Sequence, residues 1–416
     1  MKRVSDAIGL KLPTTEQRPH HEIKTIEFIA ERYNQAPQLN IRIFTAIEDP
    51  FLKAEWERLQ QESDIFPQSS YHWCATWWKH LGGRRTLHIV MAVDDQGQAV
   101  AIAPLCIERH FGSKVLRSFP VHFGDFYTFI TSSDEDGTAV DRIVRYITQS
   151  NRWTWVRIEQ VRETDVLSQS FQKAGYKQKR LTGSVVAFFE GLSWEEYLAK
   201  LQKSFRQNIR SRLRKLDRNF EIALKVTTCW DDYKYEYDAM RTMHEQRWCD
   251  DNAPHKSDIA ISCWREAIKG QIADGKMIYY QLLFNGDRAA YRLGFIHRGT
   301  YYAWHTGYNP YYRDYFPGIM IMACMIQEFM KLGISSVNFM AGEYDWKLDW
   351  SPDRAVVSHY MFSSPTKNMR SAFLNLYHHR LRDPMKAWYH LMMKYRLLRV
   401  FSRRAIALRQ KFAGQR

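Results

Sequence analysis

Three side chains in the stretch MHEQRW have the types and the spacing of a ligand-binding helix face. His244, Arg247 and Trp248 stand at positions i, i+3 and i+4, so a helix would present all three on one side. A guanidinium can hold a carboxylate or a phosphate through two parallel hydrogen bonds, and an indole can stack on a sugar or an adenine. We interpret the three residues as substrate-binding. A helix docked by its aromatic side chain, with a hydrogen-bonded histidine, is the structural alternative.

The loop NPYYRDYFPG, residues 309–318, has the composition of an anion site. It follows an aromatic, strand-like stretch and precedes an apolar helical stretch at 318–332. Peptide N–H groups at the start of a helix carry about half a positive charge, and Arg313 adds a full one. The pattern predicts that Arg313, Gly318 and the neighbouring Tyr308 bind a pyrophosphate or a carboxylate. A plain turn bounded by two prolines is the alternative.

Two further residues could serve as a general base. Glu343 comes just after a predicted strand at 335–340, and His305 lies on the predicted strand 300–308. An imidazole, with an ordinary pKa of about 6.5, needs little adjustment to accept a proton at neutral pH. In a regular strand, His305 would share one face with Tyr301.

These residues depend on strands and helices that the hydrophobic pattern predicts. LHIVMAVDDQGQAVAIAPLCIER and MIYYQLLFNGDRAAYRLGFIHR each contain two strands around a turn, and Asn-Gly between apolar runs is a strong hairpin signal. Further strand, helix and strand follow each hairpin, which indicates a duplicated α/β unit. We expect a mixed α+β fold of the α/β class in four parts: a polar leader at 1–38, a first unit at 39–190, a second unit at 191–364 and a basic amphipathic helical tail at 365–416.

Three stretches around the loop carry a resemblance to a known family: SFRQNIRSRLRKL, MHEQRW and NFMAGEYDWKLDW, in this order. Together they resemble the CelD-like branch of the GNAT acyltransferases, which is associated with cellulose and other exopolysaccharide biosynthesis and is related to the FemABX peptidyltransferases. The resemblance extends over about residues 40–360 and includes YHWCATWWKHL, APL and HFGDFY in the first half. The residues that match the family's pattern are Phe339, Gly342, Lys347 and Trp350, and those that depart from it are Asn338 and Trp346.

The resemblance implies two tandem GNAT-like units with central mixed sheets, the first a scaffold and the second catalytic. It implies an acyl-CoA-dependent N- or O-acyltransferase in which an acceptor attacks the thioester directly, with acetyl-CoA as co-substrate and no metal. The acceptor would be a sugar, an amine, or a glycolipid or polysaccharide precursor. Glu343 and His305 would be catalytic, backbone amides at 306–308 would stabilise the oxyanion, and Trp350 and Lys347 would bind the acceptor, unless Lys347 pairs with a neighbouring aspartate.

The net charge of +15 is concentrated in two places. Residues 366–416 contain 13 Lys and Arg against one Asp, and residues 200–218 contain eight against one Asp. The run at 200–218 predicts either a solvated helix face or a positive wall for a polyanionic donor, CoA or tRNA. The tail predicts a helix that lies on an anionic membrane or covers a groove of its own domain. Its apolar residues at helical spacing are Trp388, Leu391, Met392, Tyr395 and Leu398.

Composition excludes several other classes of protein. With 45% hydrophobic and 25% charged residues the chain is not mainly disordered, and its six cysteines show no zinc or disulfide spacing. We expect a cytoplasmic protein without a signal or membrane helix, with possible peripheral contact at the inner face of the membrane. Two other functions stay open: FemABX-like transfer of an amino acid from aminoacyl-tRNA, and a catalytically inactive GNAT-like module that binds nucleic acid or anchors a membrane assembly.

Overall fold

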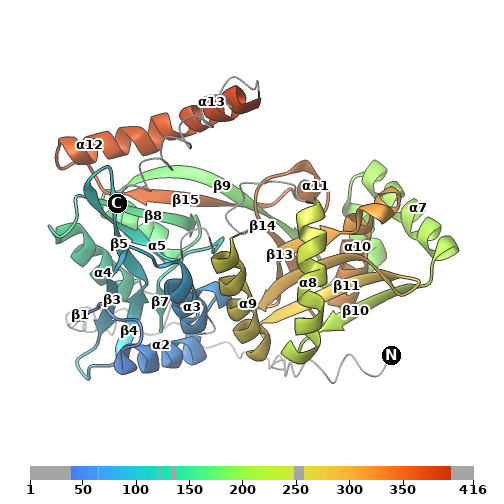
Figure 1. The fold of residues 1–416 in the computed structure, drawn as a ribbon, viewed down its shortest axis with the longest axis horizontal. Helices are drawn as coiled ribbons and strands as arrows, with labels where there is room; N and C mark the ends of the chain where they lie inside the picture. The colour runs from blue at the N-terminus through green and yellow to red at the C-terminus, as the bar shows by residue number, and fades with distance from the viewer. Residues whose placement is uncertain (1–38, 64, 121–122, 133–136, 248–256, 395–416) are drawn as a thin grey trace, which may run out of the picture.

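The computed structural model describes residues 39–63, 65–120, 123–132, 137–247 and 257–394. They form a mixed α+β fold of two lobes, which confirms the predicted fold class (Figure 1). The predicted leader and the last part of the predicted tail, 395–416, lie outside the described residues.

Two sheets contain the strands of the described residues. The larger has eleven strands in the order β10 (Ile222–Thr227), β11 (Met277–Phe284), β12 (Asp287–His297), β13 (Thr300–Tyr308), β14 (Ser336–Ala341), β9 (Lys177–Phe188), β15 (Val356–Ser363), β8 (Trp155–Arg162), β6 (Ser113–Ser118), β5 (Leu105–His110) and β2 (Thr86–Leu87). The smaller has four, in the order β1 (Asn40–Phe44), β3 (Ile89–Val93), β4 (Ala99–Ala103) and β7 (Ile130–Thr131). The pairs β13–β14 and β6–β8 are parallel, whereas the other pairs are antiparallel.

Helices cover both lobes. Those of the first lobe are α2 (Pro50–Ser63), η2 (Pro67–Ser69), α3 (Tyr71–Leu81), α4 (Thr138–Gln149) and α5 (Val166–Lys173). Those of the second lobe are α6 (Trp194–Lys200), α7 (Lys203–Asn219), α8 (Trp230–Arg247), α9 (Asp258–Ala273), η4 (Pro310–Tyr315), α10 (Pro317–Lys331) and α11 (Asp345–Leu348). The tail contributes α12 (Met369–Leu376), η5 (Tyr377–Leu381) and α13 (Arg382–Lys394).

Both predicted hairpins form. β3 pairs with β4, and β11 pairs with β12 around Asn285 and Gly286, whose φ angles are 50° and 85°. Positive φ at both turn residues is typical of the two-residue turns whose twist matches that of the paired strands. The predicted helix after the basic loop is α10, and the predicted strand that follows it is β14.

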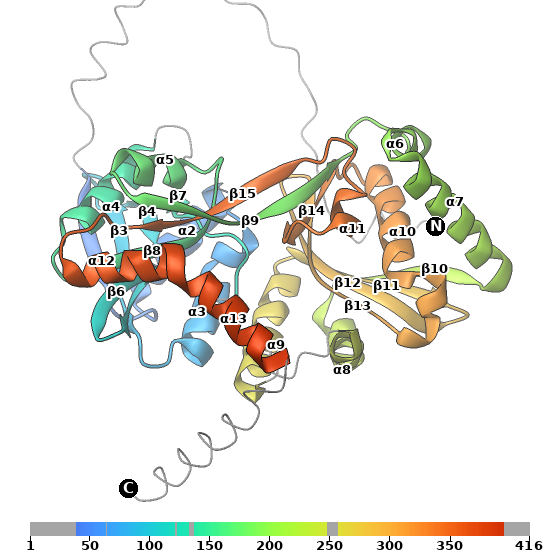
Figure 2. The same cartoon turned by 90° about the horizontal axis from the view of Figure 1, so that it is seen from above.

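Two long strands join the lobes. β9 pairs with β14 on one side and with β15 on the other, and β15 pairs in turn with β8 (Figure 2). β15 therefore belongs to the second predicted unit, 191–364, along the chain but extends the sheet of the first lobe. One sheet runs through both lobes, and the division near 190 stays a prediction.

Helices α3 and α9 also hold the lobes together. The indole of Trp73 in α3 packs edge-on to Phe295 and Trp304 of the second lobe, with ring centroids 5.6 and 5.3 Å apart. In α9, Nε2 of Gln271 donates a hydrogen bond of 2.8 Å to Oγ of Ser70, which caps α3. The tryptophan-rich helix α3 thus lies at the interface between the two lobes. Residues of both lobes can therefore contribute to one site.

The described part of the tail packs on the first lobe. Nε1 of Trp155 in β8 donates to Oδ1 of Asn375 (3.0 Å), and its ring stacks on His378 with centroids 4.8 Å apart. Trp388 of the predicted amphipathic face is 59% exposed, so the choice between a membrane surface and a groove of the tail's own domain stays a prediction. Tyr395 and Leu398 of the predicted amphipathic face lie outside the described residues. None of the helices described is both long enough and apolar enough to cross a bilayer.

Candidate active site

Strands β13 and β14 separate and leave a wedge in the larger sheet. They pair at three consecutive positions, from Thr300 with Ser336 to Tyr302 with Asn338. β13 then continues alongside β12 as far as Tyr308, while β14 continues along β9 instead. Beyond the three pairs, each strand borders the wedge rather than the other strand.

The backbone N–H groups of Thr306 and Tyr308 point from β13 toward this wedge. The N–H of the following Asn309 donates to the carbonyl of Ala289, which directly precedes Ala290, the partner of Tyr308 on β12. Antiparallel strands alternate between residues that bond to the neighbouring strand and residues that point away from it. The backbone N–H groups of residues 306 and 308 therefore point away from β12.

A bulge in β13 decides the face on which His305 lies. Tyr302 pairs with Phe295. The next pair joins His305 to Leu293, so two residues of β13 stand opposite one residue of β12. Tyr301 packs against α10, whereas His305 lies on the opposite face, against α8 and α9. The predicted common face of Tyr301 and His305 is wrong, because the extra residue shifts the alternation of side chains by one.

His305 and His244 lie against each other on that face. Their ring centroids are 4.2 Å apart, and Trp264 of α9 packs edge-on to His305 at 4.6 Å. The hydroxyl of Tyr291 is 3.2 Å from Nδ1 of His244 and 3.4 Å from Nδ1 of His305. The fold thus brings together a predicted catalytic residue and a predicted substrate-binding residue. The rest of the predicted helix face lies outside the described residues: Trp248 and the side chain of Arg247.

Helix α10 begins beside the wedge. Pro317 is buried in its first turn, and the ring of Tyr308 lies 3.6 Å from the place where a Cβ on Gly318 would stand. Arg313 lies earlier, in η4, where its side chain is 76% exposed and 3.5 Å from the carboxylate of Asp314. Tyr308 and Gly318 are therefore adjacent, whereas Arg313 lies at the surface.

A buried guanidinium lies under this first turn of α10. Arg292 of β12 is 3% exposed and donates from Nη2 to the carbonyl of Gly318 (3.2 Å). Its Nε has no hydrogen-bond partner among the residues that the structure describes. Burial lowers the pKa of Arg292 to about 10, so the group stays charged at neutral pH. A buried cation with an unused donor, next to the N-terminal end of a helix, favours an anion.

Lys347 provides a second buried cation at the end of β14. It belongs to the short helix α11, is 5% exposed, and donates from Nζ to the carbonyls of the last two residues of β14, at 3.2 and 2.7 Å. These carbonyls, and not a neighbouring aspartate, are its hydrogen-bond partners. The ring of Trp346 is 5.7 Å from this Nζ and 5.9 Å from the guanidinium of Arg292. Burial lowers the pKa of Lys347 to about 8; the charge of Asp125 opposes this shift and that of Arg292 adds to it.

Asp125 is a site residue that the sequence reasoning missed. It comes from the first lobe, where its backbone N–H donates to Oε1 of Gln68 (3.0 Å). Loss of solvation raises the pKa of the carboxyl to about 6, and the charge of Lys347 acts in the opposite direction. A carboxyl that titrates near neutral pH is suited to accept a proton in a reaction. The signal in the sequence was an acidic residue between aromatic ones, in HFGDFY.

Glu343 and Trp350 lie away from these charges. Oε1 of Glu343 is exposed and pairs with Nη2 of Arg180 in β9 at 2.6 Å. Trp350 is 1% exposed and packs edge-on to Phe205, with ring centroids 5.1 Å apart. Trp350 is therefore a core residue in this structure. A contact between its ring and a substrate would require the core around α10 to open.

The wedge as a whole is suited to an anionic carrier and a proton transfer. Two buried cations and a helix N-terminus can hold phosphate oxygens or a developing oxyanion, and the carboxyl of Asp125 can accept a proton. In the described ranges, no cluster of three or more His, Cys, Asp or Glu side chains is arranged to hold a metal ion.

Comparisons with known proteins found a matching family model and solved structures of similar fold. A family described as the acetyltransferase (GNAT) domain matches residues 203–348, which include β13, α10, β14 and α11. No curated protein matches the sequence. Among solved structures, the crystal structure of FemX is 10% identical with a TM-score of 0.52, over 78% of this chain and 96% of that chain. The structure of L-PGS from Bacillus licheniformis is 12% identical with a TM-score of 0.50, over 80% and 96%.

At these identities the structural similarity shows a shared fold. The CelD-like branch suggested by the sequence is not confirmed by these comparisons. Residues 203–348 match a GNAT-type acetyltransferase domain, within a chain of FemX-like fold, and this supports an acyl-transfer function.

Proposed function

We propose that the protein is an acyl-CoA-dependent acyltransferase that acetylates an amine or a hydroxyl of a sugar or of a polysaccharide precursor. The observation that carries this proposal is a pair of buried cations, Arg292 under the first turn of α10 and Lys347 at the end of β14, each within 6 Å of the ring of Trp346. Burying two like charges near one another is costly unless an anion compensates them. The unused Nε of Arg292, judged against the described residues, suits the pyrophosphate of CoA.

The residues of the wedge support the following roles. The acceptor N–H or O–H would lose its proton to the carboxylate of Asp125 while its nitrogen or oxygen bonds to the thioester carbon. The backbone N–H groups of residues 306 and 308 would stabilise the oxyanion. Collapse of the tetrahedral intermediate breaks the C–S bond and releases the thiolate, which takes a proton from the ammonium of Lys347. Asp125 replaces Glu343 as the preferred base because its pKa is raised toward neutrality.

The histidine pair belongs to a separate part of the proposal. His305 and His244 lie on the face of the sheet opposite α10, so they would line the acceptor side rather than the carrier side. The role of His305 as a general base stays a prediction, and so do the substrate-binding roles of His244, Arg247 and Trp248.

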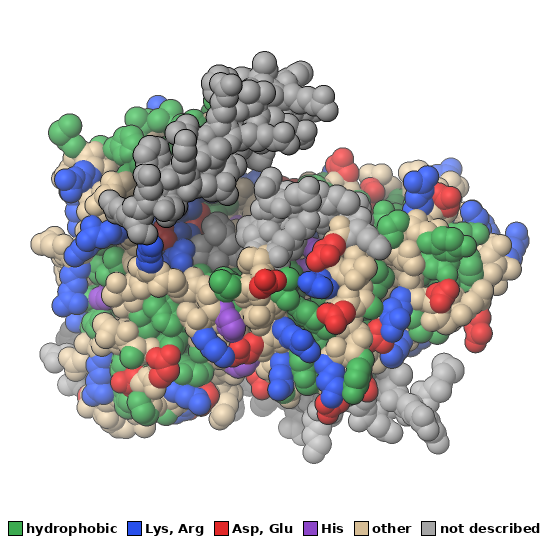
Figure 3. All heavy atoms as spheres, in the orientation of Figure 1, with side chains coloured by type: hydrophobic (Ala, Val, Ile, Leu, Met, Phe, Trp, Pro, Cys, Tyr) green, Lys and Arg blue, Asp and Glu red, His purple; other side chains and the backbone are tan. Residues whose placement is uncertain are grey.

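One observation favours an aminoacyl-tRNA donor as the second candidate. The basic helix α7 lies along the loop that precedes α10: the guanidinium of Arg212 is 3.5 Å from the ring centre of Phe316, and Nζ of Lys215 is 4.6 Å from that of Tyr315. Basic side chains lie at the end of the molecule that α7 occupies, with acidic and hydrophobic side chains between them (Figure 3). This wall would suit a polyanion larger than CoA.

Calorimetric titration of acetyl-CoA tests the proposal. We expect Arg292→Met to weaken binding at least tenfold, whereas Arg288→Met, on the same strand but half exposed and paired with Glu236, should bind as the parent does. Equal loss in both variants, or no binding to the parent at millimolar acetyl-CoA, would overturn it. Binding of aminoacyl-tRNA that Lys215→Glu abolishes would establish the second candidate instead, and binding of acetyl-CoA without turnover on any amine or sugar would indicate an inactive module.

A further inference from the structure

A charged cavity lies outside the wedge, between the first lobe and the tail. It has a volume of about 380 Å³ and is bordered by strands β6, β8 and β9 on one side and by η5 and α13 on the other. The charged and titratable side chains that line it are Arg117, Tyr127, Glu159, Lys179, Arg180, His378, Arg382 and Asp383, and Lys179 pairs with Asp383 at 2.6 Å. Neither the acetyltransferase match, which ends at residue 348, nor the proposed reaction accounts for this cavity.

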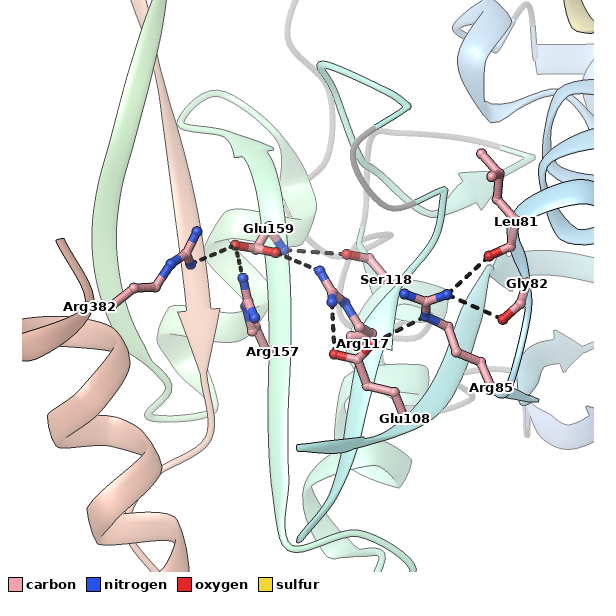
Figure 4. A network of polar contacts seen from close by, with 9 residues as sticks. All are labelled: Leu81, Gly82, Arg85, Glu108, Arg117, Ser118, Arg157, Glu159 and Arg382. Atoms are coloured by element: carbon pink, nitrogen blue, oxygen red, sulfur yellow. Dashed lines mark hydrogen bonds and ion pairs between the residues drawn. The ribbon is translucent and has the colours of Figure 1, made fainter. Parts of the chain in front are cut away.

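Positive charge is in excess in a network of ion pairs that reaches the wall of the cavity (Figure 4). The guanidinium groups of Arg85, Arg117, Arg157 and Arg382 share the carboxylates of Glu108 and Glu159. Of these residues, Arg117, Glu159 and Arg382 line the cavity. Glu108 pairs with Arg85 and Arg117, at 3.1 and 2.7 Å. Glu159 pairs with Arg117 at 2.9 Å and, at 2.6 and 3.7 Å, with two further arginines, residues 157 and 382. Because the arginines hold the pKa of Glu159 at about 2 against the effect of its burial, its charge is permanent, and the network carries two positive charges more than it neutralises.

Several buried nitrogens in this region have no partner among the described residues. They are Nε of Arg117, Nε of Arg157 and both ring nitrogens of His378. Arg117 is 5% exposed and His378 is 2% exposed, and both line the cavity. Burial and the charges of Arg157 and Arg382 lower the pKa of His378 to about 3, so its neutral ring offers one donor and one acceptor. Buried polar atoms are nearly always hydrogen-bonded, so unpartnered nitrogens on side chains that border a cavity favour a further polar partner close by. His378 also lies in η5, a π-helical turn, and such turns occur frequently at functional sites.

We propose that this cavity is a second anion site, which binds the phosphate group of a ligand other than the acyl donor. Planar guanidinium groups match the oxygens of a phosphate through paired hydrogen bonds, and the fold supplies them from two directions, Arg117 from the sheet and Arg382 from the tail. Arg382 is 20% exposed on its side chain, so it can reach an occupant without first leaving the core. The site does not depend on the proposed acyl transfer.

The cavity also borders the backbone segment that carries Asp125. Gly124 and Phe126, which flank Asp125, are part of its lining, and so is Arg180, the ion-pair partner of Glu343. A phosphate ester held there would lie against the backbone segment that carries Asp125. Occupancy would also tie the tail to the first lobe, because Arg382 belongs to α13.

Titration of the full chain with inorganic pyrophosphate tests the site. We expect Arg382→Gln to weaken binding at least tenfold. Arg380→Gln, an exposed arginine two residues away, should leave it unchanged. Binding that Arg292→Met abolishes and Arg382→Gln does not would place the anion in the wedge and overturn the proposal. Equal affinity of Arg382→Gln, Arg380→Gln and the parent would also overturn it.

Two further probes distinguish the sources of the phosphate. Glycerol 3-phosphate represents a soluble ester, and vesicles of phosphatidylglycerol, compared with phosphatidylcholine, represent a lipid headgroup. Sedimentation with phosphatidylglycerol vesicles that is lost in Arg382→Gln and kept in Arg380→Gln identifies a lipid; the same pattern in calorimetry with glycerol 3-phosphate identifies a soluble ester. If neither probe distinguishes the two variants, the cavity is not a phosphate site.

Discussion

Replacement of Lys347 by methionine separates the cost of burying this cation from its use in the reaction. Methionine keeps the length of the side chain but removes the charge. Nζ of Lys347 donates to two backbone carbonyls, at 3.2 and 2.7 Å, and a hydrogen bond from a charged group contributes about 1.5–3 kcal/mol to stability. Against this, the fall of the pKa from 10.5 to about 8 corresponds to about 3 kcal/mol that the folded protein loses by keeping the ammonium away from water.

Because the two contributions largely cancel, we expect the free energy of unfolding of Lys347→Met to fall by no more than about 3 kcal/mol. Turnover should fall much further, by about 100-fold or more, because the charged group that gives a proton to the leaving thiolate is lost. Denaturation in guanidinium chloride measures the first quantity, and thiol release from acetyl-CoA in the presence of acceptor measures the second. Lys331→Met, at the exposed C-terminal end of α10, is the matched control.

Two results would refute this reasoning. A folded Lys347→Met protein with the turnover of the parent would show that the ammonium takes no part in the reaction. Loss of stability far beyond the expected range would show that Lys347 serves mainly to hold the end of β14, and that its burial was not the dominant cost.

Three further predictions concern pH, the alternative base and the core. The rate constant kcat/KM should rise as pH passes about 6, where Asp125 loses its proton, and fall as pH passes about 8, where Lys347 loses its own; a pH profile of Asp125→Asn should lack the lower limb. Glu343→Gln removes an exposed ion pair with Arg180, so unfolding experiments should show a loss under about 1 kcal/mol, and unchanged kcat is expected; a 100-fold drop in kcat would restore Glu343 as the base. Trp350→Ala should lower the free energy of unfolding by about 3–5 kcal/mol, measured by denaturant titration, because a large buried ring leaves a cavity; a loss below 1 kcal/mol would contradict its place in the core.

Local patterns in the chain were sufficient to predict the elements around the site. Alternating apolar residues around Asn285 and Gly286 predicted the hairpin β11–β12, and an apolar run after Pro317 predicted α10. Hairpin turns and helix starts depend on residues that are close in sequence, so their signals are legible without knowledge of the fold. The bulge in β13 was not predicted, because an extra residue in a strand is visible only against its partner strand.

The positions of the candidate site residues followed from the sequence in part, and their roles stay predictions. Tyr308, Gly318 and Lys347 lie around the wedge, and His305 and His244 meet, although on the opposite face of the sheet. Arg292 and Asp125 were missed because nothing in their neighbours along the chain reveals burial. Their altered pKa values arise from loss of solvation in the folded protein.

The amino-acid sequence alone determined the kind of protein this is: a basic, mixed α+β chain with a strand, a loop and an apolar helix in the order of an acyltransferase domain. It could do so because composition and the spacing of apolar residues act over short stretches of chain. Only the tertiary structure decided which charges share a site, since Asp125 and Lys347 are more than two hundred residues apart and approach each other only when the two lobes pack together. Electrostatic interactions depend on distance through space and on exclusion of water, and neither is a property of local sequence.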